Sequence, residues 1–571
     1  MNTATRRRGV FLTPLAFAEK GYRHVENSIG KQWWQSGNYR LWDMAAGTGN
    51  LEIFLPQDSH KYCYLSTLEP EDVQHLGQKF PLATVFQYDY LEDDAVKLPD
   101  ALRNDLANPE IRWIILINPP YATAQEAGLK GTSKGGVADT RIRKQMHTDG
   151  LGEVSRELYV QFLYRVMYDF QDRETILGLF SPIKYLVSTN YQKFRDRIFR
   201  AKFLSGFIFS SENFGGTSKT SHFPVAFILW DIQTNICPEF GILPFQGGIE
   251  KIDLDILDST AKKIGVKTLT QANRDIFLSR WIKRPRGTSV FPPFSSALTV
   301  KSGNVDTRNR TADGFLASLM CPGNELQNQQ QTAFLSGPQV SAGALSVTPE
   351  NFEQAVVVFA ARRIPKDSWI NHVDQLLRPN RKLSPQFVAD CAVWSLFDNK
   401  NQTVSLRNVE YRGKVYQVVN HFFPFSVAEV LSWVSCGTAV TGDFSLCPLW
   451  NLCVSCGKKI TARDTRIKIP HRAQSDSFVA DWLLRQKFSA EAEKVLTIAK
   501  AIYRFYFVNL HLLRKTEFKI ESYDAGWYQI RQALLDAKLG DDMLADLKHC
   551  HDRLKEKLLP QLYDYGVLYR T

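Results

Sequence analysis

The sequence contains no run of 18 apolar residues, and its cysteines are few and irregularly spaced. A membrane-spanning helix needs about 20 predominantly apolar residues, so none is expected. Nine cysteines in 571 residues do not suggest a disulfide framework. Cys436, Cys447, Cys453 and Cys456 leave a zinc site open as an alternative, but their spacing is irregular. Free, buried thiols and no metal are therefore the expected state.

Other absences narrow the classes of function. Arg6, Arg7 and Arg8 are not followed by an apolar stretch of signal-peptide length, so a cytoplasmic location is expected. No P-D…(D/E)-x-K cluster is evident in the sequence, which argues against a fused endonuclease. Lysine and arginine outnumber aspartate and glutamate by 70 to 59, for a formal net charge of +11. That excess suits an anionic partner, nucleic acid first, although charge alone does not distinguish DNA from RNA or a membrane surface.

The most informative stretch is Asn118-Pro119-Pro120-Tyr121. It follows residues 113–117, a short run rich in β-branched side chains that predicts a buried strand. The two prolines fix φ and remove two backbone donors, which leaves the Asn118 side-chain oxygen and the Pro119 carbonyl as aimed acceptors beside an aromatic ring. Such a group can hold a flat base by its exocyclic amine. In isolation, the motif is equally consistent with a strand that ends in a proline turn and a buried Tyr121.

A glycine turn lies upstream of this motif. Residues 39–43 predict a strand that ends at Asp43, and Gly47 and Gly49 then let the backbone bend and a ligand approach. A helix is expected to start behind the turn. The dinucleotide fingerprint requires a further glycine at the position of Glu52, so that interpretation fails. Asp43 would repel a pyrophosphate and suits a cationic or hydroxyl-rich ligand, such as S-adenosylmethionine.

Acidic residues end two further predicted strands. Residues 65–69 end in Glu69, which lies 20 residues after Gly49, about where an acid contacts ribose hydroxyls in doubly wound nucleotide sites. Residues 84–89 end in Asp89, which could bind the adenine amine of a cofactor. Each acid is also compatible with a solvated strand end that has no ligand.

Together these segments resemble the class I N6-adenine DNA methyltransferases over roughly residues 1–235. Residues 43–50 are similar to the family's cofactor motif, usually D-P-A-C-G-[ST]-G-N, and residues 118–121 look like its catalytic motif. Residues 8–14 are similar to the G-x-[FY]-x-T-P element that precedes the cofactor strand in the subgroup with this motif order.

The resemblance implies S-adenosylmethionine as the cofactor. Met44 and Ala46 depart from the family motif, but both stand at turn or packing positions and do not threaten the chemistry. The early element would line the methionine end of the cofactor, whereas the two strand-end acids match only by order and placement. The implied cofactor-binding residues are Phe11, Thr13, Pro14, Asp43, Ala45, Gly47, Gly49, Asn50, Glu69 and Asp89.

The resemblance also implies methyl transfer to N6 of a flipped-out adenine in double-stranded DNA, with Asn118, Pro119, Pro120 and Tyr121 as the catalytic residues. Hydrogen bonds from both amine protons to Asn118 Oδ1 and the Pro119 carbonyl would localise the nitrogen lone pair for in-line attack, without a metal. Tyr121 would stack on the base. Phe214, in a glycine-flanked loop after a predicted strand, is the candidate for the second wall, although it could simply pack in its loop.

Basic residues in two regions are the candidates for DNA contact. Residues 122–146, rich in glycine, predict a mobile loop that becomes ordered on phosphate contact, with a plain solvated loop as the alternative. Residues 280–286 are the densest of four basic patches in the second half, the others lying within 362–369, 378–382 and 458–472. The candidate DNA-binding residues are Lys130, Lys134, Arg141, Arg143, Arg280, Lys283, Arg284 and Arg286.

Predicted strands alternate with helices in the first half, which indicates an α/β fold with a Rossmann-like, doubly wound, mostly parallel sheet. An amphipathic helix over 158–170 and apolar strands over 175–182, 203–209 and 223–230 continue the alternation, which is lost from about residue 245. The length implies about three or four domains. The expected domains are a methyltransferase domain over 1–245, a mixed α+β target-recognition domain over 246–472 and a helical bundle over 473–571.

Other functions stay open at this point. The N-P-P-Y motif also occurs in RNA and protein methyltransferases, and the cytosine-N4 subgroup usually carries serine at the position of Asn118. A catalytically silent DNA-binding subunit of a defence complex is the non-enzymatic alternative, although the motifs are intact. The expected partners are double-stranded DNA and, within a restriction-modification or phage-defence system, a separate restriction or defence subunit, with no membrane.

Overall fold

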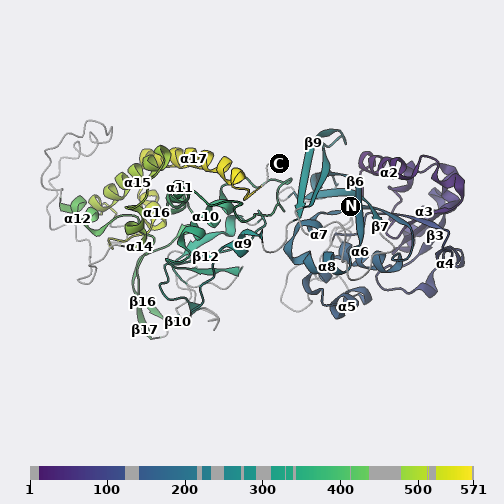
Figure 1. The fold of residues 1–571 in the computed structure, drawn as a ribbon, viewed down its shortest axis with the longest axis horizontal. Coiled ribbons are helices and arrows are strands. Elements are labelled where there is room, and N and C mark those ends of the chain that lie inside the picture. Colours follow the sequence, from purple (N-terminus) through teal and green to yellow (C-terminus); the bar gives the residue numbers. More distant parts are fainter. Residues whose placement is uncertain are drawn as a thin grey trace. The chain divides into compact units, whose positions relative to one another are not determined.

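The structure, a computed structural model, describes two compact units of the chain (Figure 1). Unit 1 holds the described residues up to 274 together with Asp367–Gln375, and unit 2 holds those of 275–366 and 376–570. The described residues are 12–121, 140–214, 222–232, 250–271, 276–287, 289–290, 310–327, 329–337, 343–411, 413–435, 477–510, 512–513 and 522–568.

Unit 1 is built on a nine-stranded sheet in the order β3-β2-β1-β4-β5-β7-β6-β8-β9. The first five strands are parallel, and β7 then runs antiparallel to both β5 and β6. β8 is parallel to β6 and pairs with β9 as an antiparallel hairpin. The strands are β1 (Tyr39–Asp43), β2 (Cys63–Thr67), β3 (Thr84–Gln87), β4 (Arg112–Ile117), β5 (Thr175–Pro182), β6 (Ala201–Ser210), β7 (Pro224–Ile232), β8 (Glu250–Leu257) and β9 (Lys263–Gln271).

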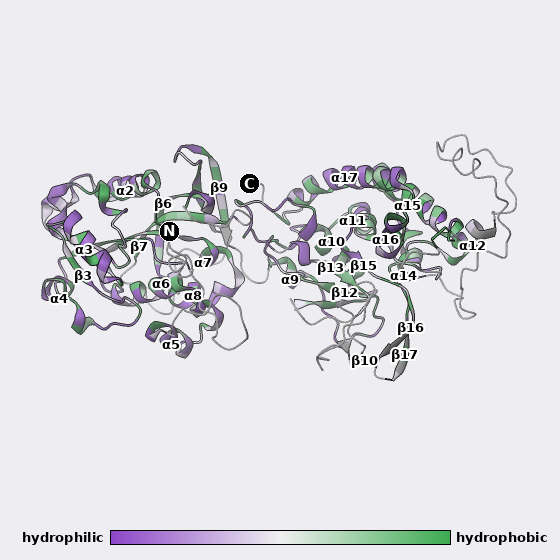
Figure 2. Ribbon diagram, turned by 180° about the vertical axis from the view of Figure 1, so that it is seen from behind, coloured by the Kyte–Doolittle hydropathy of each residue, from purple (hydrophilic) through white to green (hydrophobic). Residues whose placement is uncertain are grey.

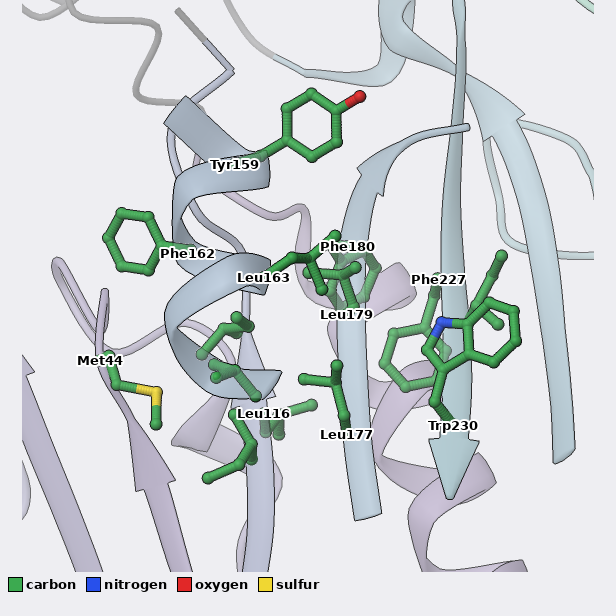
Figure 3. Close-up of a cluster of buried hydrophobic side chains, with 14 of the residues drawn as sticks. Met44, Leu116, Tyr159, Phe162, Leu163, Leu177, Leu179, Phe180, Phe227 and Trp230 are labelled. Carbon is green, nitrogen blue, oxygen red and sulfur yellow. The ribbon is translucent and has the colours of Figure 1, made fainter. Parts of the chain in front are cut away.

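Helices cover both faces of this sheet. Successive residues of a strand point to opposite faces, so Leu179 and Phe180 of β5 mark the two sides. A Cβ added at Gly21 of α2 would lie 3.1 Å from the Phe180 ring, whereas α6 points Leu163 toward Leu179 (Figure 3). The α/β doubly wound class expected from the sequence is therefore confirmed. The helices of unit 1 are α2 (Leu15–Ile29), α3 (Pro70–Lys79), α4 (Asp100–Ala107), α5 (Arg141–Thr148), α6 (Leu158–Asp169), α7 (Lys184–Val187) and α8 (Gln192–Arg197).

The centre of the sheet is fully apolar. Residues 113–117 of β4 are almost completely buried, as expected for a parallel strand that is covered on both faces. Figure 3 shows the same core extending across β5 to Phe227 and Trp230 of β7. This rigid centre fixes the positions at which the strands end.

A distant segment completes unit 1. In Asp367–Gln375, Val373 is buried in the core of unit 1, and Asp374 Oδ2 accepts a hydrogen bond from Lys267 Nζ of β9 at 2.6 Å. Both members of this ion pair are largely buried. Burial lowers the pKa of Lys267 and raises that of Asp374, while their mutual attraction acts in the opposite direction on each.

Unit 2 combines a small sheet with a helical layer. Its four-stranded sheet has the order β14-β12-β13-β15, and β10–β11 and β16–β17 form two-stranded ribbons. The strands are β10 (Ser289–Val290), β11 (Arg310–Thr311), β12 (Ala317–Met320), β13 (Ala333–Leu335), β14 (Leu345–Val347), β15 (Asn401–Gln402), β16 (Leu406–Tyr411) and β17 (Lys414–Val418). The helices are α9 (Leu278–Trp281), α10 (Phe352–Arg363), α11 (Pro385–Phe397), α12 (Val427–Ser435), α14 (Phe478–Leu483), α15 (Ala490–Val508), α16 (Trp527–Ala537) and α17 (Asp541–Asp564).

The helices of unit 2 surround α10 and α11, which are buried along most of their length. The long helix α17 alternates hydrophilic and hydrophobic stretches in Figure 2. Its buried residues Leu547, Leu554, Leu558 and Leu562 follow the spacing of a single helix face, which packs on α11 and α15. The C-terminal helices therefore share one apolar core with the preceding residues.

This division differs from the three domains expected at 1–245, 246–472 and 473–571. Beyond residue 245, β8 and β9 extend the sheet of unit 1, and the helices after 473 belong to the same compact unit as α10 and α11. The physical reason is long-range pairing and packing, which leaves no local signature in the sequence. Within the described part of the chain, no helix is long and apolar enough to cross a membrane. The described cysteines, Cys63, Cys321, Cys391 and Cys550, are free.

Candidate active site

The candidate site lies where β1 and β4, neighbouring parallel strands, end at the same edge of the sheet. From β1 the chain continues to β2 and β3 on one side, and β4 and β5 lie on the other, so this point is the topological switch of the sheet. Ligands of doubly wound sheets bind in the crevice at such a point. Asp43 is the last residue of β1 and Asn118 directly follows β4, so the fold brings both motifs together.

The two glycines of the turn serve different purposes. Gly47 has φ +51° and Gly49 has φ +71°, both in the left-handed region. A Cβ at Gly49 would come within 2.5 Å of the Phe80 ring, so this glycine lets the turn pack on α3. Among the described residues, a Cβ at Gly47 would meet only the Ala45 carbonyl, at 3.9 Å, so that part of the chain leaves room for a ligand to approach the backbone here. Lys79 of α3 fixes the turn by donating hydrogen bonds to its carbonyls.

The α-helix expected behind the turn is absent from this segment. Residues 52–54 and 57–62 instead form two short 3₁₀ helices separated by Pro56. Proline has no backbone N–H and disfavours helical φ/ψ in the residue before it, so the first turn cannot propagate. The dipole of an α-helix directly behind the glycine turn therefore does not contribute to this site.

Asp43 forms a buried pair with Glu52. Asp43 Oδ1 accepts a hydrogen bond from the Ala45 N–H at 2.7 Å. Within the described residues, neither Asp43 Oδ2 nor either carboxyl oxygen of Glu52 has a protein donor, and the two carboxyl groups contact each other. Burial raises the pKa of Asp43 well above its usual range, and repulsion from Glu52 raises it further. Burial also raises the pKa of Glu52, to about 7. The pair is therefore satisfied by sharing a proton.

The catalytic motif is joined to the N-terminal element by hydrogen bonds. Asn118 Nδ2 donates to Thr13 Oγ1 at 2.8 Å, and Tyr121 OH donates to Asn118 Oδ1 at 2.7 Å. The Thr13 carbonyl accepts a further hydrogen bond from Asn50 Nδ2 at 3.1 Å. Thr13, which immediately precedes the N-cap Pro14 of α2, therefore contacts both the glycine turn and the catalytic motif.

Aromatic rings surround Tyr121. Phe214 follows β6 and is buried, and its ring lies edge-on to Tyr121 with centroids 6.1 Å apart. Tyr159 of α6 lies edge-on at 6.4 Å. Burial raises the pKa of Tyr121 well above its usual range, so its hydroxyl stays protonated. The structure therefore brings the predicted stacking pair together, whereas Tyr159 was not predicted because its helical spacing indicated only core packing.

The two strand-end acids lie at the same edge of the sheet. Glu69 is exposed and forms the N-cap of α3, two residues after the end of β2. Asp89 follows β3, and its Oδ1 accepts from the N–H groups of Leu91 and Glu92 at 2.9 and 3.2 Å. Asp89 thus stabilises its own turn, and contact of either acid with a cofactor stays a prediction.

The predicted basic loop beside the catalytic motif differs in its last part. Residues 141–148 form α5, capped by the Thr140 hydroxyl, because the apolar side chains Ile142 and Met146 pack in the core. Arg141 is exposed but donates to the carbonyls of Glu92 and Asp93, and Arg143 is buried. The guanidinium groups of these two arginines therefore do not fit the prediction of simple surface contacts for DNA phosphates. Lys130, Lys134 and Phe11 lie outside the described residues.

In unit 2, the predicted patch at 280–286 is on the surface, where Arg280, Lys283, Arg284 and Arg286 are all exposed. The patch predicted within 362–369 is wrong in part, since Arg362 is buried among backbone carbonyls and Arg363 pairs with the buried Asp398. These two arginines stabilise the fold of unit 2. The patch within 458–472 and the four cysteines considered for zinc lie outside the described residues. Among the residues that are described, no group of three or more metal-ligating side chains occurs.

No protein-family model matches the sequence, and no curated protein matches it. Several solved structures resemble parts of the chain. The DrdV–DNA complex, determined by cryo-electron microscopy, is 15% identical over 47% of this chain and 30% of that chain, with a TM-score of 0.33. The M protein of the type I restriction enzyme EcoKI is 13% identical over 43% of this chain and 48% of that chain, with a TM-score of 0.26. The type IIL restriction-modification enzyme MmeI, in complex with DNA, is 8% identical over 99% and 77%, with a TM-score of 0.32.

This chain thus spans less than half of the first two of these proteins. At such identities and TM-scores, the likeness assigns no function. The interpretation of the site rests on its residues.

Proposed function

We propose that this chain is a DNA methyltransferase that transfers a methyl group from S-adenosylmethionine to the N6 amine of adenine. The observation that carries the proposal is the Asn118 amide, held at the end of β4 with its oxygen directed at a hydrogen-bond donor. It stands beside a glycine turn at the topological switch point of the sheet. Two hydrogen-bond acceptors, an aromatic ring and an open backbone approach are what methylation of a planar amine requires.

The residues of the turn fit a cationic cofactor. Asp43 directly precedes the glycine turn and its buried carboxyl contacts that of Glu52, so we expect the pair to carry negative charge when a cationic cofactor binds. S-adenosylmethionine would bring a positively charged ammonium and an electrophilic methyl group to this edge. We expect Asp43, Gly47 and Asn50 to hold it, with Glu69 and Asp89 as further candidates.

The amine nitrogen of adenine is a poor nucleophile because its lone pair is delocalised into the ring. Asn118 Oδ1 and the Pro119 carbonyl, each accepting one amine proton, would favour a tetrahedral nitrogen with a localised lone pair. The residues supply orientation and aimed dipoles rather than a strong base. We expect Tyr121 and Phe214 to flank the base once it leaves the duplex, which costs a few kcal/mol.

Double-stranded DNA is the favoured substrate because of the net charge of +11 and the exposed basic residues at 280–286 of unit 2. A restriction-modification or phage-defence role, with a separate restriction or defence subunit, is part of the same proposal. The basic residues at 280–286 are the first candidates for the surface that recognises DNA.

The direct test is to express the chain in a host that lacks adenine methylation and to sequence the genomic DNA for modified bases. A methylated adenine motif is expected, and Asn118→Ala should abolish it while leaving the protein folded. Asn104→Ala, an exposed change on α4, is the matched control and should methylate normally. Modification of cytosine, or methylation that persists in Asn118→Ala, would refute the proposed chemistry.

A further inference from the structure

Thr13 joins three parts of the site that are far apart in the sequence. Its side chain is almost completely buried, with 2% exposed. Its hydroxyl oxygen accepts from Asn118 Nδ2 at 2.8 Å, 105 residues away, and its carbonyl accepts from Asn50 Nδ2 at 3.1 Å. Thr13 therefore contacts both the Asn118 amide and the glycine turn.

The Asn118 amide can point in two directions, and only one of them serves the proposed reaction. Rotation by 180° about the last side-chain bond exchanges the acceptor Oδ1 with the donor Nδ2. An amine that keeps its protons offers only donors, so it requires Oδ1 to face it. Nδ2 must then find an acceptor on the other side, or it remains buried without a partner.

In the structure, the hydroxyls of Thr13 and Tyr121 occupy the two ends of the amide. A hydroxyl can either donate or accept, so neither of these two contacts by itself fixes which end of the amide faces the substrate. Substrate breaks this symmetry, because an amine that replaces the Tyr121 hydroxyl on Oδ1 can only donate. The Thr13 oxygen is then the acceptor that keeps Asn118 in the reactive orientation.

We propose, on the basis of the function proposed above, that Thr13 is a positioning residue for methyl transfer, whose hydroxyl oxygen holds the Asn118 amide with Oδ1 facing the substrate amine. Its place next to Asn50 also connects the orientation of this amide to the glycine turn. The role is distinct from lining the cofactor, because Thr13 acts on the catalytic amide itself.

The test compares Thr13→Val, which keeps the shape and removes the hydroxyl, with Thr13→Ser, which keeps the hydroxyl. Single-turnover methyl transfer is measured with tritiated S-adenosylmethionine at saturation, on genomic DNA from a methylation-deficient host. Loss of this one buried hydrogen bond predicts a rate roughly 2- to 10-fold lower in Thr13→Val, with Thr13→Ser close to wild type. Calorimetry with S-adenosylmethionine should give a nearly unchanged Kd for both variants.

A matched control isolates the role of the Thr13 hydroxyl. Thr175→Val is the matched control, since Thr175 is equally buried at the start of β5 and donates only to the Arg173 carbonyl. It should leave the rate unchanged. If Thr13→Val does not fold by circular dichroism, Thr13→Ala replaces it.

Either of two results would overturn the role of Thr13. One is a Thr13→Val rate equal to the wild-type rate at saturating S-adenosylmethionine. This holds even if the Kd for S-adenosylmethionine rises, because the residue would then act on cofactor binding alone. The other is a loss of rate in Thr13→Ser as large as that in Thr13→Val. An inactive wild-type protein would instead count against the proposed function, so the two failures are distinguishable.

Discussion

Replacement of Glu52 by glutamine should stabilise unit 1 at neutral and alkaline pH. The Glu52 carboxyl is completely buried beside Asp43, and burial raises its pKa from the ordinary 4.5 to about 7. The charge of Lys79 of α3 opposes this rise in the pKa of Glu52, and Glu52 in turn helps burial to raise the pKa of the Cys63 thiol. Glutamine keeps the shape, carries no charge, and can donate an N–H to Asp43 Oδ2 in place of the shared proton.

The sign and size follow from proton binding. Between pH 4.5 and about 7, the folded state keeps the Glu52 proton that the unfolded chain has already lost. Rising pH therefore favours unfolding, and the full penalty, about 3 kcal/mol, is present above pH 7. Below pH 4.5 both states are protonated and the penalty vanishes. Asp43 shifts in the same direction and adds to this trend.

The assay is urea unfolding at pH 4.5 and pH 8, read by hydrogen exchange of peptides from β1 and β4, which lie in unit 1. Glu52→Gln should be more stable than wild type by about 2–3 kcal/mol at pH 8 and within about 1 kcal/mol of it at pH 4.5. Glu110→Gln, an exposed change, is the control and should show no difference at either pH. A difference between Glu52→Gln and wild type that does not depend on pH would refute the shared-proton pair, as would a less stable variant at pH 8.

Two further changes separate packing from ligand contact. Gly49→Ala places a methyl group against the Phe80 ring in a left-handed conformation, so it should destabilise unit 1 by about 2–4 kcal/mol in urea unfolding. Gly47→Ala has more room, so it should lower the free energy of unfolding by only about 1–2 kcal/mol, while it weakens S-adenosylmethionine binding in calorimetry. The reverse pattern in the two variants would contradict these assignments. Tyr121→Phe removes the hydroxyl that occupies Asn118 Oδ1, so kcat/KM should stay equal or rise up to about 5-fold, whereas a tenfold loss would show that this hydroxyl binds substrate.

Local patterns predicted the elements that position the site. β1 and β5 have the predicted bounds, since short apolar runs bounded by turn residues leave little alternative to a buried strand. Phe214 does lie near Tyr121, because both follow strands that end at one edge of the sheet, but the rings pack edge-on, as they would in simple packing too. Their functional roles stay predictions.

What the sequence did not predict depends on partners distant along the chain. Glu52 was noticed only as a missing glycine, although its burial against Asp43 makes it part of the site. Two charged residues of proposed DNA-binding patches, Arg143 and Arg362, turned out to be buried. The burial of an arginine cannot be recognised from its neighbours in the sequence, because it depends on which carbonyls the fold brings near the guanidinium. The 3₁₀ helices behind the glycine turn were foreseeable from Pro56.

The return of Asp367–Gln375 to unit 1 has a consequence for synthesis on the ribosome. The first 274 residues do not contain all of unit 1, so its last pieces, Val373 and Asp374, arrive only after residues 275–366 have been translated. Until then Lys267 has no carboxylate partner, a state that costs about 3–5 kcal/mol once the lysine is buried. Unit 1 thus matures late, and it cannot be excised as an N-terminal fragment without losing part of its own core.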